Sequence, residues 1–150
     1  MVRQQHLKFF VPSNRLGSRG VTHLDGMNEI INANRTNRYV GAKQERENVA
    51  NVQAFAEVAM RQQHWLPLNR RKAHVKVTFV EVDARRDVSN IYGGLKFVLD
   101  GLSHPRGSKT LGAGAIWDDS PKWVECEAHV RIDKDNPGAE IEIWEVATND

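Results

Sequence analysis

Cysteine is almost absent from this chain of 150 residues, because Cys126 is the only one. A single cysteine excludes an intramolecular disulfide and every zinc site built on four cysteines, and it suits a reducing compartment. Long apolar runs are also absent. No segment approaches the roughly 20 apolar residues of a membrane span, and no apolar stretch follows the first residues as in a signal peptide. We therefore expect a cytoplasmic protein that has no membrane partner.

Proline and glycine are sparse, at 5 and 11 residues, while 40% of the chain is hydrophobic and 27% is charged. These values exclude a disordered chain and a fibrous repeat. A chain of this length can bury one sizeable core, and we see no internal repeat or linker. We therefore expect a single domain over residues 1–150.

The net charge of +2 hides an asymmetry between the two halves of the chain. Residues 1–72 carry 12 Lys and Arg against 5 Asp and Glu, and residues 73–150 carry 9 against 14. A basic half suits contacts to phosphate groups, and an acidic half suits a hard cation. Solvated faces produce the same imbalance, so both interpretations stay open at this point.

The apolar pattern predicts both strands and helices. Apolar residues alternate with polar ones in four segments, which predicts strands at residues 7–11, 75–79, 124–132 and 139–144. Helical spacing predicts helices at residues 27–34, 41–65 and 91–102, and segments rich in Gly, Ser and Arg predict loops at residues 14–26 and 103–114. This order predicts an α+β fold, a two-layer α/β domain with a mixed sheet of about four strands and helices on one face.

Several catalytic motifs are missing. The nearest approach to the Gly-x-Ser-x-Gly of serine hydrolases, residues 101–105, ends in proline where a helix should start. The glycines at 112 and 114 lack the helix that follows a dinucleotide-binding loop, so we expect no small-molecule cofactor. The six histidines lack the spacing of zinc ligands. Cys126 falls on the apolar side of its strand, so we expect a buried side chain rather than a nucleophile.

Two acidic clusters remain as candidates for chemistry. Asp83 and Asp87 lie where a predicted strand leads into a predicted helix, and Asp118 and Asp119 follow an apolar segment. Magnesium prefers oxygen ligands, usually one or two carboxylates completed by water and substrate phosphate. A phosphodiesterase uses such an ion to activate water and to neutralise charge on the leaving oxygen.

A purely structural interpretation of these clusters competes with the metal-binding one. Asp87 alone is typical of a turn, Ser89 of a helix N-cap, and the pair at 118–119 of a cap before a helical turn. The basic residues Arg85 and Arg86 beside one cluster favour the paired, functional interpretation.

The order and spacing of residues 85–90, 99–102 and 116–119 resemble the RusA family of Holliday junction resolvases. Members carry a basic run leading into Asp-x-Asp-Asn, a helix with a lysine near its middle, and a later Asp-Asp pair. Asp87 and Asn90 match the first motif, and residues 118–119 match the pair. Lys96 matches the lysine if a short insertion around residues 92–93 is allowed. The Pro-Ser-Asn at residues 12–14 and the closing hairpin also resemble the family, so the resemblance covers nearly the whole chain.

The resemblance implies a set of site residues. The implied catalytic residues are Asp87, Lys96 and Asp119, and the implied ligands of Mg²⁺ are Asp87, Ser89, Asp118 and Asp119. Phosphate contacts, assigned by charge, would come from Arg15, Arg19, Arg70, Arg71, Lys72, Arg85, Arg86, Arg106 and Lys109.

Ser89 departs from the family pattern, because it stands where the second metal aspartate is expected. A hydroxyl is a weaker magnesium ligand than a carboxylate. Three explanations stay open: Ser89 holds a metal-bound water, Asp83 or Glu81 replaces the missing ligand, or the protein binds junctions without cutting them. We favour retained activity, because the other acidic positions are present.

The resemblance also implies a function. It implies a magnesium-dependent, structure-selective endodeoxyribonuclease that resolves four-way (Holliday) DNA junctions by paired symmetric nicks, in DNA recombination and repair. The implied assembly is a homodimer on branched DNA, in the cytoplasm of a bacterial or phage-infected cell. The alternative is a branched-DNA binding protein of the same fold without catalysis.

Overall fold

A four-stranded mixed sheet is the centre of the computed structural model, which describes residues 5–13, 15–16, 22–23, 35, 37–105 and 112–147. The sheet has the order β1-β6-β4-β5. Its strands are β1 (His6–Pro12), β4 (Ala73–Glu81), β5 (Val124–Ile132) and β6 (Gly138–Glu145). β6 is antiparallel to both β1 and β4, whereas β5 is parallel to β4. The predicted mixed sheet of about four strands is therefore confirmed.

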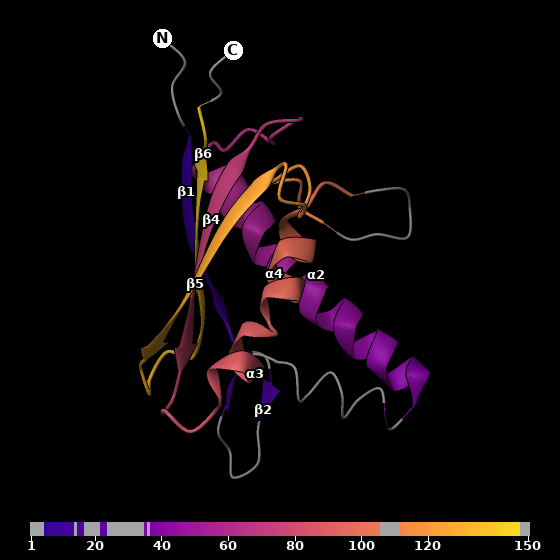
Figure 1. The fold of residues 1–150 in the computed structure, drawn as a ribbon, viewed down its shortest axis with the longest axis vertical. Helices are drawn as coiled ribbons and strands as arrows, with labels where there is room; N and C mark the ends of the chain where they lie inside the picture. The colour runs from indigo at the N-terminus through magenta and orange to yellow at the C-terminus, as the bar shows by residue number, and fades with distance from the viewer. Residues whose placement is uncertain are drawn as a thin grey trace.

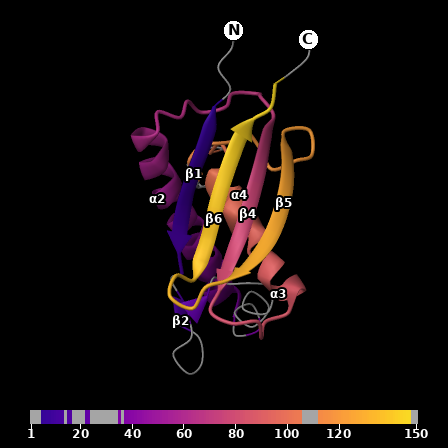
Figure 2. The same ribbon diagram turned by 90° about the vertical axis from the view of Figure 1, so that its left-hand side faces the viewer.

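The described helices lie on one face of this sheet (Figure 1). They are α2 (Arg38–Gln62), α3 (Val88–Tyr92) and α4 (Leu95–Leu102). Figure 2 looks onto the opposite face, where the four strands lie in front of the helices. This arrangement confirms the predicted α+β class with two layers. None of the described helices combines the length and the apolar character that crossing a membrane requires.

The core lies between the sheet and the helices. Alternation along β4 and β6 turns Val75, Val77, Ile141 and Ile143 toward the helices, and all four are fully buried. Burial of each such side chain stabilises the fold by about 1.5–3 kcal/mol. The residues between them turn to the open face of the sheet, which is polar.

Helices α2 and α4 cross closely at Gly101. A Cβ built on Gly101 would lie 2.7 Å from Cβ of Val52 and 3.0 Å from the backbone oxygen of Val49. Those distances leave no room for a side chain, so glycine is required at this crossing. The close contact fixes α4 against α2 and thereby sets the positions of polar residues on both helices.

The helix boundaries differ from those predicted. α2 begins at Arg38, where Asn37 is the N-cap and its Oδ1 accepts a hydrogen bond from the backbone of Val40 at 2.9 Å. The single helix predicted over residues 91–102 is two helices, because the chain makes a turn at Gly93 and Gly94 between α3 and α4. Glycine weakens a helix because it loses more backbone entropy than other residues on folding.

The N-cap of α3 is Asp87, and Ser89 lies inside its first turn. The expectation that Ser89 caps the helix is therefore wrong. The two-residue strands β2 (Arg15–Leu16) and β3 (Thr22–His23) pair antiparallel inside the predicted loop at residues 14–26. The helix predicted at residues 27–34 lies outside the described residues.

Cys126 is exposed, and the expectation of a buried side chain is wrong. Among the strands that the structure describes, β5 is at the edge of the sheet and pairs only with β4. Alternation correctly assigns Cys126 to the side of Val124 and Val130, but an edge strand receives less cover from the helices than a central one. Partial desolvation, followed by the charge of Glu127, raises the pKa of the thiol, which opposes a role as a thiolate nucleophile.

Candidate functional site

The acidic residues of interest lie at two ends of the unit formed by α3 and α4. We call residues 81–89 the α3 end. There Asp87 occupies the N-cap position of α3 without a side-chain capping bond, and both Asp87 and Ser89 are exposed. Oδ1 of Asp83 accepts a hydrogen bond from the backbone nitrogen of Arg85 at 3.0 Å. This bond is typical of a turn, so Asp83 shapes the loop that leads into α3.

A buried ion pair anchors the α3 end. Nη1 of Arg86 donates to both carboxylate oxygens of Glu81, at 3.0 and 3.2 Å, and the two side chains are only 18% and 5% exposed. A buried carboxylate is held only when it is paired and hydrogen-bonded. Glu81 is therefore neutralised by Arg86 rather than offered to a metal ion, and Arg86 is poorly placed for a phosphate contact.

The second group is made of charged residues along α4 and after its C-terminus, and we call Glu45, Lys96, Asp100, Asp118 and Asp119 the α4 end. Nζ of Lys96 lies 3.8 Å from Oε1 of Glu45, so this pair links α4 to α2. Partial burial raises the pKa of Asp100, and the nearby charge of Asp119 raises it further. Lys96 opposes the rise, whereas Glu45 adds to it. The α4 end therefore holds carboxylates close enough to repel one another.

Backbone hydrogen bonds bring the Asp118-Asp119 pair to α4. The amide of Ile116 donates to the carbonyl oxygen of Leu102 at 3.1 Å, and the amide of His104 donates to that of Trp117 at 3.4 Å. Leu102 is in the last turn of α4, where carbonyl groups lack partners within the helix. The amide of Ile116 bonds to one of these carbonyl groups. This bond holds the segment before the aspartates against the end of α4, so Asp119 lies near Asp100.

An aromatic stack adjoins the same two aspartates. The ring of His104 stacks on that of Trp117, with ring centroids 4.8 Å apart and planes 26° from parallel. Cζ of Arg70 lies 5.9 Å from the centroid of Trp117, within the range of a cation–π interaction. Arg70 has a φ of 54°, which few residues other than glycine adopt. The structure therefore brings a predicted phosphate contact, Arg70, to Trp117, the residue before Asp118.

The α3 end and the α4 end are at opposite ends of the helical unit (Figure 1). Asp87 follows the end of β4, while Asp119 precedes the start of β5, and the two strands are parallel. β4 and β5 pair over nine residues, so the two ends of their ladder lie about 26 Å apart at about 3.3 Å per residue. Ligands of one magnesium ion must all approach it to about 2.1 Å. The structure thus brings Asp119 together with Asp100 and not with Asp87.

No group of three or more His, Cys, Asp and Glu residues within the described ranges is placed to hold a metal ion. The implied ligand set of Asp87, Ser89, Asp118 and Asp119 is accordingly not assembled in that part of the chain. Magnesium commonly uses only one or two protein carboxylates, and the α4 end has two neighbouring carboxylates, Asp100 and Asp119.

Three of the other predicted phosphate contacts have partners within the protein. Nη1 of Arg71 lies 2.6 Å from Oε1 of Glu145, Nζ of Lys72 lies 3.0 Å from Oε1 of Glu125, and Nε of Arg85 lies 3.6 Å from Oδ2 of Asp83. The side chain of Arg15 and the whole of Arg19, Arg106 and Lys109 lie outside the described residues.

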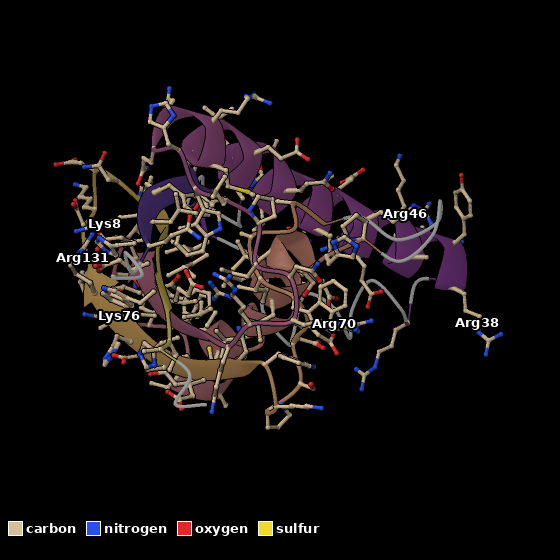
Figure 3. All side chains as sticks on the ribbon, turned by 90° about the horizontal axis from the view of Figure 1, so that it is seen from above. Lys8, Arg38, Arg46, Arg70, Lys76 and Arg131 are labelled. Carbon is tan, nitrogen blue, oxygen red and sulfur yellow. The ribbon has the colours of Figure 1, made fainter. Side chains whose placement is uncertain are left out.

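Further cations lie away from the predicted set. Figure 3 shows Lys8, Lys76 and Arg131 on the sheet side of the molecule, and Arg38 and Arg46 along α2. The basic residues are therefore divided between the open face of the sheet and the helical side.

No protein-family model, curated protein or solved structure matches the chain. Two residues at the α4 end, Asp100 and Glu45, have no place in the predicted site. The spacing of four residues between Lys96 and Asp100 puts both on one helix face and was the available signal for Asp100. Glu45 has no such signal, because only the crossing of α2 and α4 brings it near.

Proposed function

We propose that this chain is a magnesium-dependent, structure-selective endodeoxyribonuclease that resolves four-way DNA junctions by paired symmetric nicks. The proposed assembly is a homodimer in the cytoplasm of a bacterial or phage-infected cell. The observation that carries the proposal is the α4 end, where Asp100 lies near both Asp119 and Lys96, with the cation–π contact of Arg70 and Trp117 before the Asp118-Asp119 pair. The RusA-like motifs of the sequence supply the class of substrate.

The donors at the α4 end fit magnesium. Asp100 and Asp119 would hold the ion, since their side chains offer oxygen ligands alone and lie close enough to repel one another. A bound Mg²⁺ supplies positive charge at the scissile phosphate and favours deprotonation of the attacking water.

The protein residues around these carboxylates have separate roles in the proposal. Lys96, exposed on α4, adds positive charge near the phosphate that is cut. Arg70 contacts a neighbouring phosphate, and its position over Trp117 restricts the motion of its guanidinium group. Asp87 and Ser89 lie outside this set, so the serine at position 89 removes no ligand from the α4 end.

Nicking of a synthetic four-way junction, measured across a magnesium titration beside a linear duplex, tests the proposal. Asp119→Asn should reduce nicking at least about 100-fold and leave junction affinity unchanged or tighter, because it removes a ligand and also a negative charge facing phosphate. The matched control is Asp87→Asn, another exposed aspartate, which should stay within about threefold of the wild type. Equal nicking by the wild type and Asp119→Asn would overturn the assignment.

A branched-DNA binding protein without catalysis is the second candidate. It is favoured by the separation of Asp87 from Asp119, since the carboxylates that the RusA-like motifs imply as one ligand set lie at opposite ends. This candidate predicts tight junction binding by the wild type with no nicking in magnesium or manganese. The same titration therefore separates the two functions.

A further inference from the structure

The two edges of the sheet are protected to different degrees. At the β1 edge, the side chain of Gln63 accepts from the backbone nitrogen of Lys8 at 3.1 Å and donates to its oxygen at 2.6 Å. Pro12 ends that strand and offers no amide hydrogen. At the other edge, β5 runs for nine residues without proline or glycine, and of the described strands it pairs with β4 alone. Figure 2 shows no other described strand along its outer side.

An edge of this kind presents unpaired backbone groups on which another strand can form. Among the described residues, the hydroxyl of Tyr92 donates to the carbonyl oxygen of Ala128 at 3.0 Å. That oxygen has a second lone pair and can accept a further hydrogen bond. β5 is therefore available to a partner strand along most of its length.

The sequence of β5 allows two copies of the strand to pair antiparallel with matching charge and hydrophobicity. Its residues are Val-Glu-Cys-Glu-Ala-His-Val-Arg-Ile, with Ala128 at the centre. In an antiparallel pair of two copies about Ala128, Glu125 lies opposite Arg131 of the second copy, and Glu127 lies opposite His129. On the other face Cys126 lies opposite Val130, and Val124 lies opposite Ile132. Acidic residues thus meet basic ones, and apolar residues meet apolar ones.

The charged residues of β5 are accessible to a second copy. Glu125, Glu127, His129 and Arg131 have side chains that are 41–53% exposed. Within the chain these residues pair along β5 itself or with residues on the side of β5 that faces β4 and β6. Lys72 pairs with Glu125, and Glu140 pairs with Arg131. A residue in an internal strand has cross-strand neighbours on both sides. A second copy of β5 would supply neighbours on the outer side, where these residues now have none from a described strand.

The apolar side of β5 is incompletely covered by the described part of the chain. Cys126 is exposed and Ile132 is 50% exposed, while Ala128 and Val130 are partly buried. Pairing with a second copy would continue this apolar stripe across the junction and remove part of it from water.

We propose that two copies of this chain associate through β5, antiparallel about a two-fold axis at Ala128, to form one continuous sheet of eight strands. An isologous contact of this kind closes on itself and leaves no further copy to add. The proposal gives the homodimer of the proposed function its interface. It rests on the edge and the sequence of β5 and does not require nuclease chemistry, so it can be tested without DNA, and its failure would leave the test of nicking unaffected.

Disulfide formation tests the register. Val130→Cys should form a covalent dimer on mild oxidation, because the introduced thiol of one copy would face Cys126 of the other at a distance that a disulfide spans. Positions 126 and 130 of one strand are about 13 Å apart, so the two thiols cannot pair within a chain. The matched control is Ile132→Cys, on the same face but out of register, which should stay uncross-linked. Cross-linking of Ile132→Cys in place of Val130→Cys would overturn the proposed register.

Charge reversal tests the pairing itself, with molar mass in solution measured by light scattering and by sedimentation over a range of concentrations. Arg131→Glu should weaken the dimer by about tenfold, because two attractive pairs become repulsive. The combined Glu125→Arg and Arg131→Glu variant should restore the dimer. The pairs of these residues with Lys72 and Glu140 stay broken in that variant, so a rescue must come from contacts between the two copies. A wild type that is monomeric at all concentrations, or a combined variant as weak as Arg131→Glu, would overturn the proposal.

Discussion

The α3 end and the α4 end carry similar acidic residues in different surroundings. At the α3 end the carboxylate of Glu81 is buried and forms an ion pair with Arg86. At the α4 end Asp100 is only partly buried, and Asp119 beside it has the same charge. A buried carboxylate beside an opposite charge forms a structural ion pair. Two partly exposed carboxylates beside each other repel, and a bound cation would relieve that repulsion. Local sequence motifs do not distinguish these cases, because burial and neighbours are set by the fold.

Removal of Arg86 should have the largest effect on stability. Arg86→Met leaves the carboxylate of Glu81 buried without its partner and should lower the free energy of unfolding by about 3–5 kcal/mol. The control is Arg85→Met, which removes an exposed pair with Asp83 and should change it by about 0–1 kcal/mol. Urea denaturation measures both, and the combined Glu81→Leu and Arg86→Met variant should recover most of the loss. Equal effects of Arg85→Met and Arg86→Met would contradict a structural α3 end.

Lys96 provides the next test, because the proposal gives it a role in chemistry. Lys96→Ala should slow nicking at saturating enzyme by about tenfold, which corresponds to about 1.4 kcal/mol of barrier. Its exposed pair with Glu45 should contribute little to stability, so the unfolding free energy should change by less than about 1 kcal/mol. Lys43→Ala, on the exposed part of α2, serves as the control for general loss of charge. A rate unchanged from wild type would leave Lys96 as a surface residue.

Ser89→Asp tests the separation of the two ends directly. An acid in the first turn of α3 interacts favourably with the helix N-terminus, so stability should rise by about 0.3–1 kcal/mol. Nicking should not increase at any magnesium concentration, because position 89 is remote from Asp119. Ser89→Asn, which adds bulk without charge, is the control. Increased nicking by Ser89→Asp at low magnesium would show that the α3 end contributes to the metal site.

Asp100→Asn should have the smallest effect on stability, and the size of that effect depends on pH. Because folding raises the pKa of Asp100, the ionised side chain opposes folding above that pKa, and the opposition fades as the pH falls toward 3.8. Without magnesium, Asp100→Asn should therefore raise the melting temperature slightly at about pH 7 and less at about pH 4. Asp135→Asn, in the exposed turn before β6, is the control for a general change of surface charge. A melting temperature lowered by Asp100→Asn at neutral pH would contradict repulsion at the α4 end.

The sequence predicted the strands and the class of the fold because apolar alternation is a local signal. It did not predict the order of the strands or the parallel pairing of β4 with β5, since these depend on contacts between distant segments. The parallel pairing is also what separates Asp87 from Asp119. Cys126 was misjudged for a related reason, because alternation assigns a face to a residue but does not say whether a helix covers that face.

The pairing of β1 with β6 has a consequence for how the chain folds during synthesis. His6 bonds to Glu142, which follows it by 136 residues, so the first strand must wait for the last described one. Leu7 and Val11, fully buried in the finished sheet, lack their cross-strand partners until then. Pairings between distant segments are slow to form and leave apolar surface exposed meanwhile. β1 therefore stays without its partner strand until residues 138–145 have been synthesised.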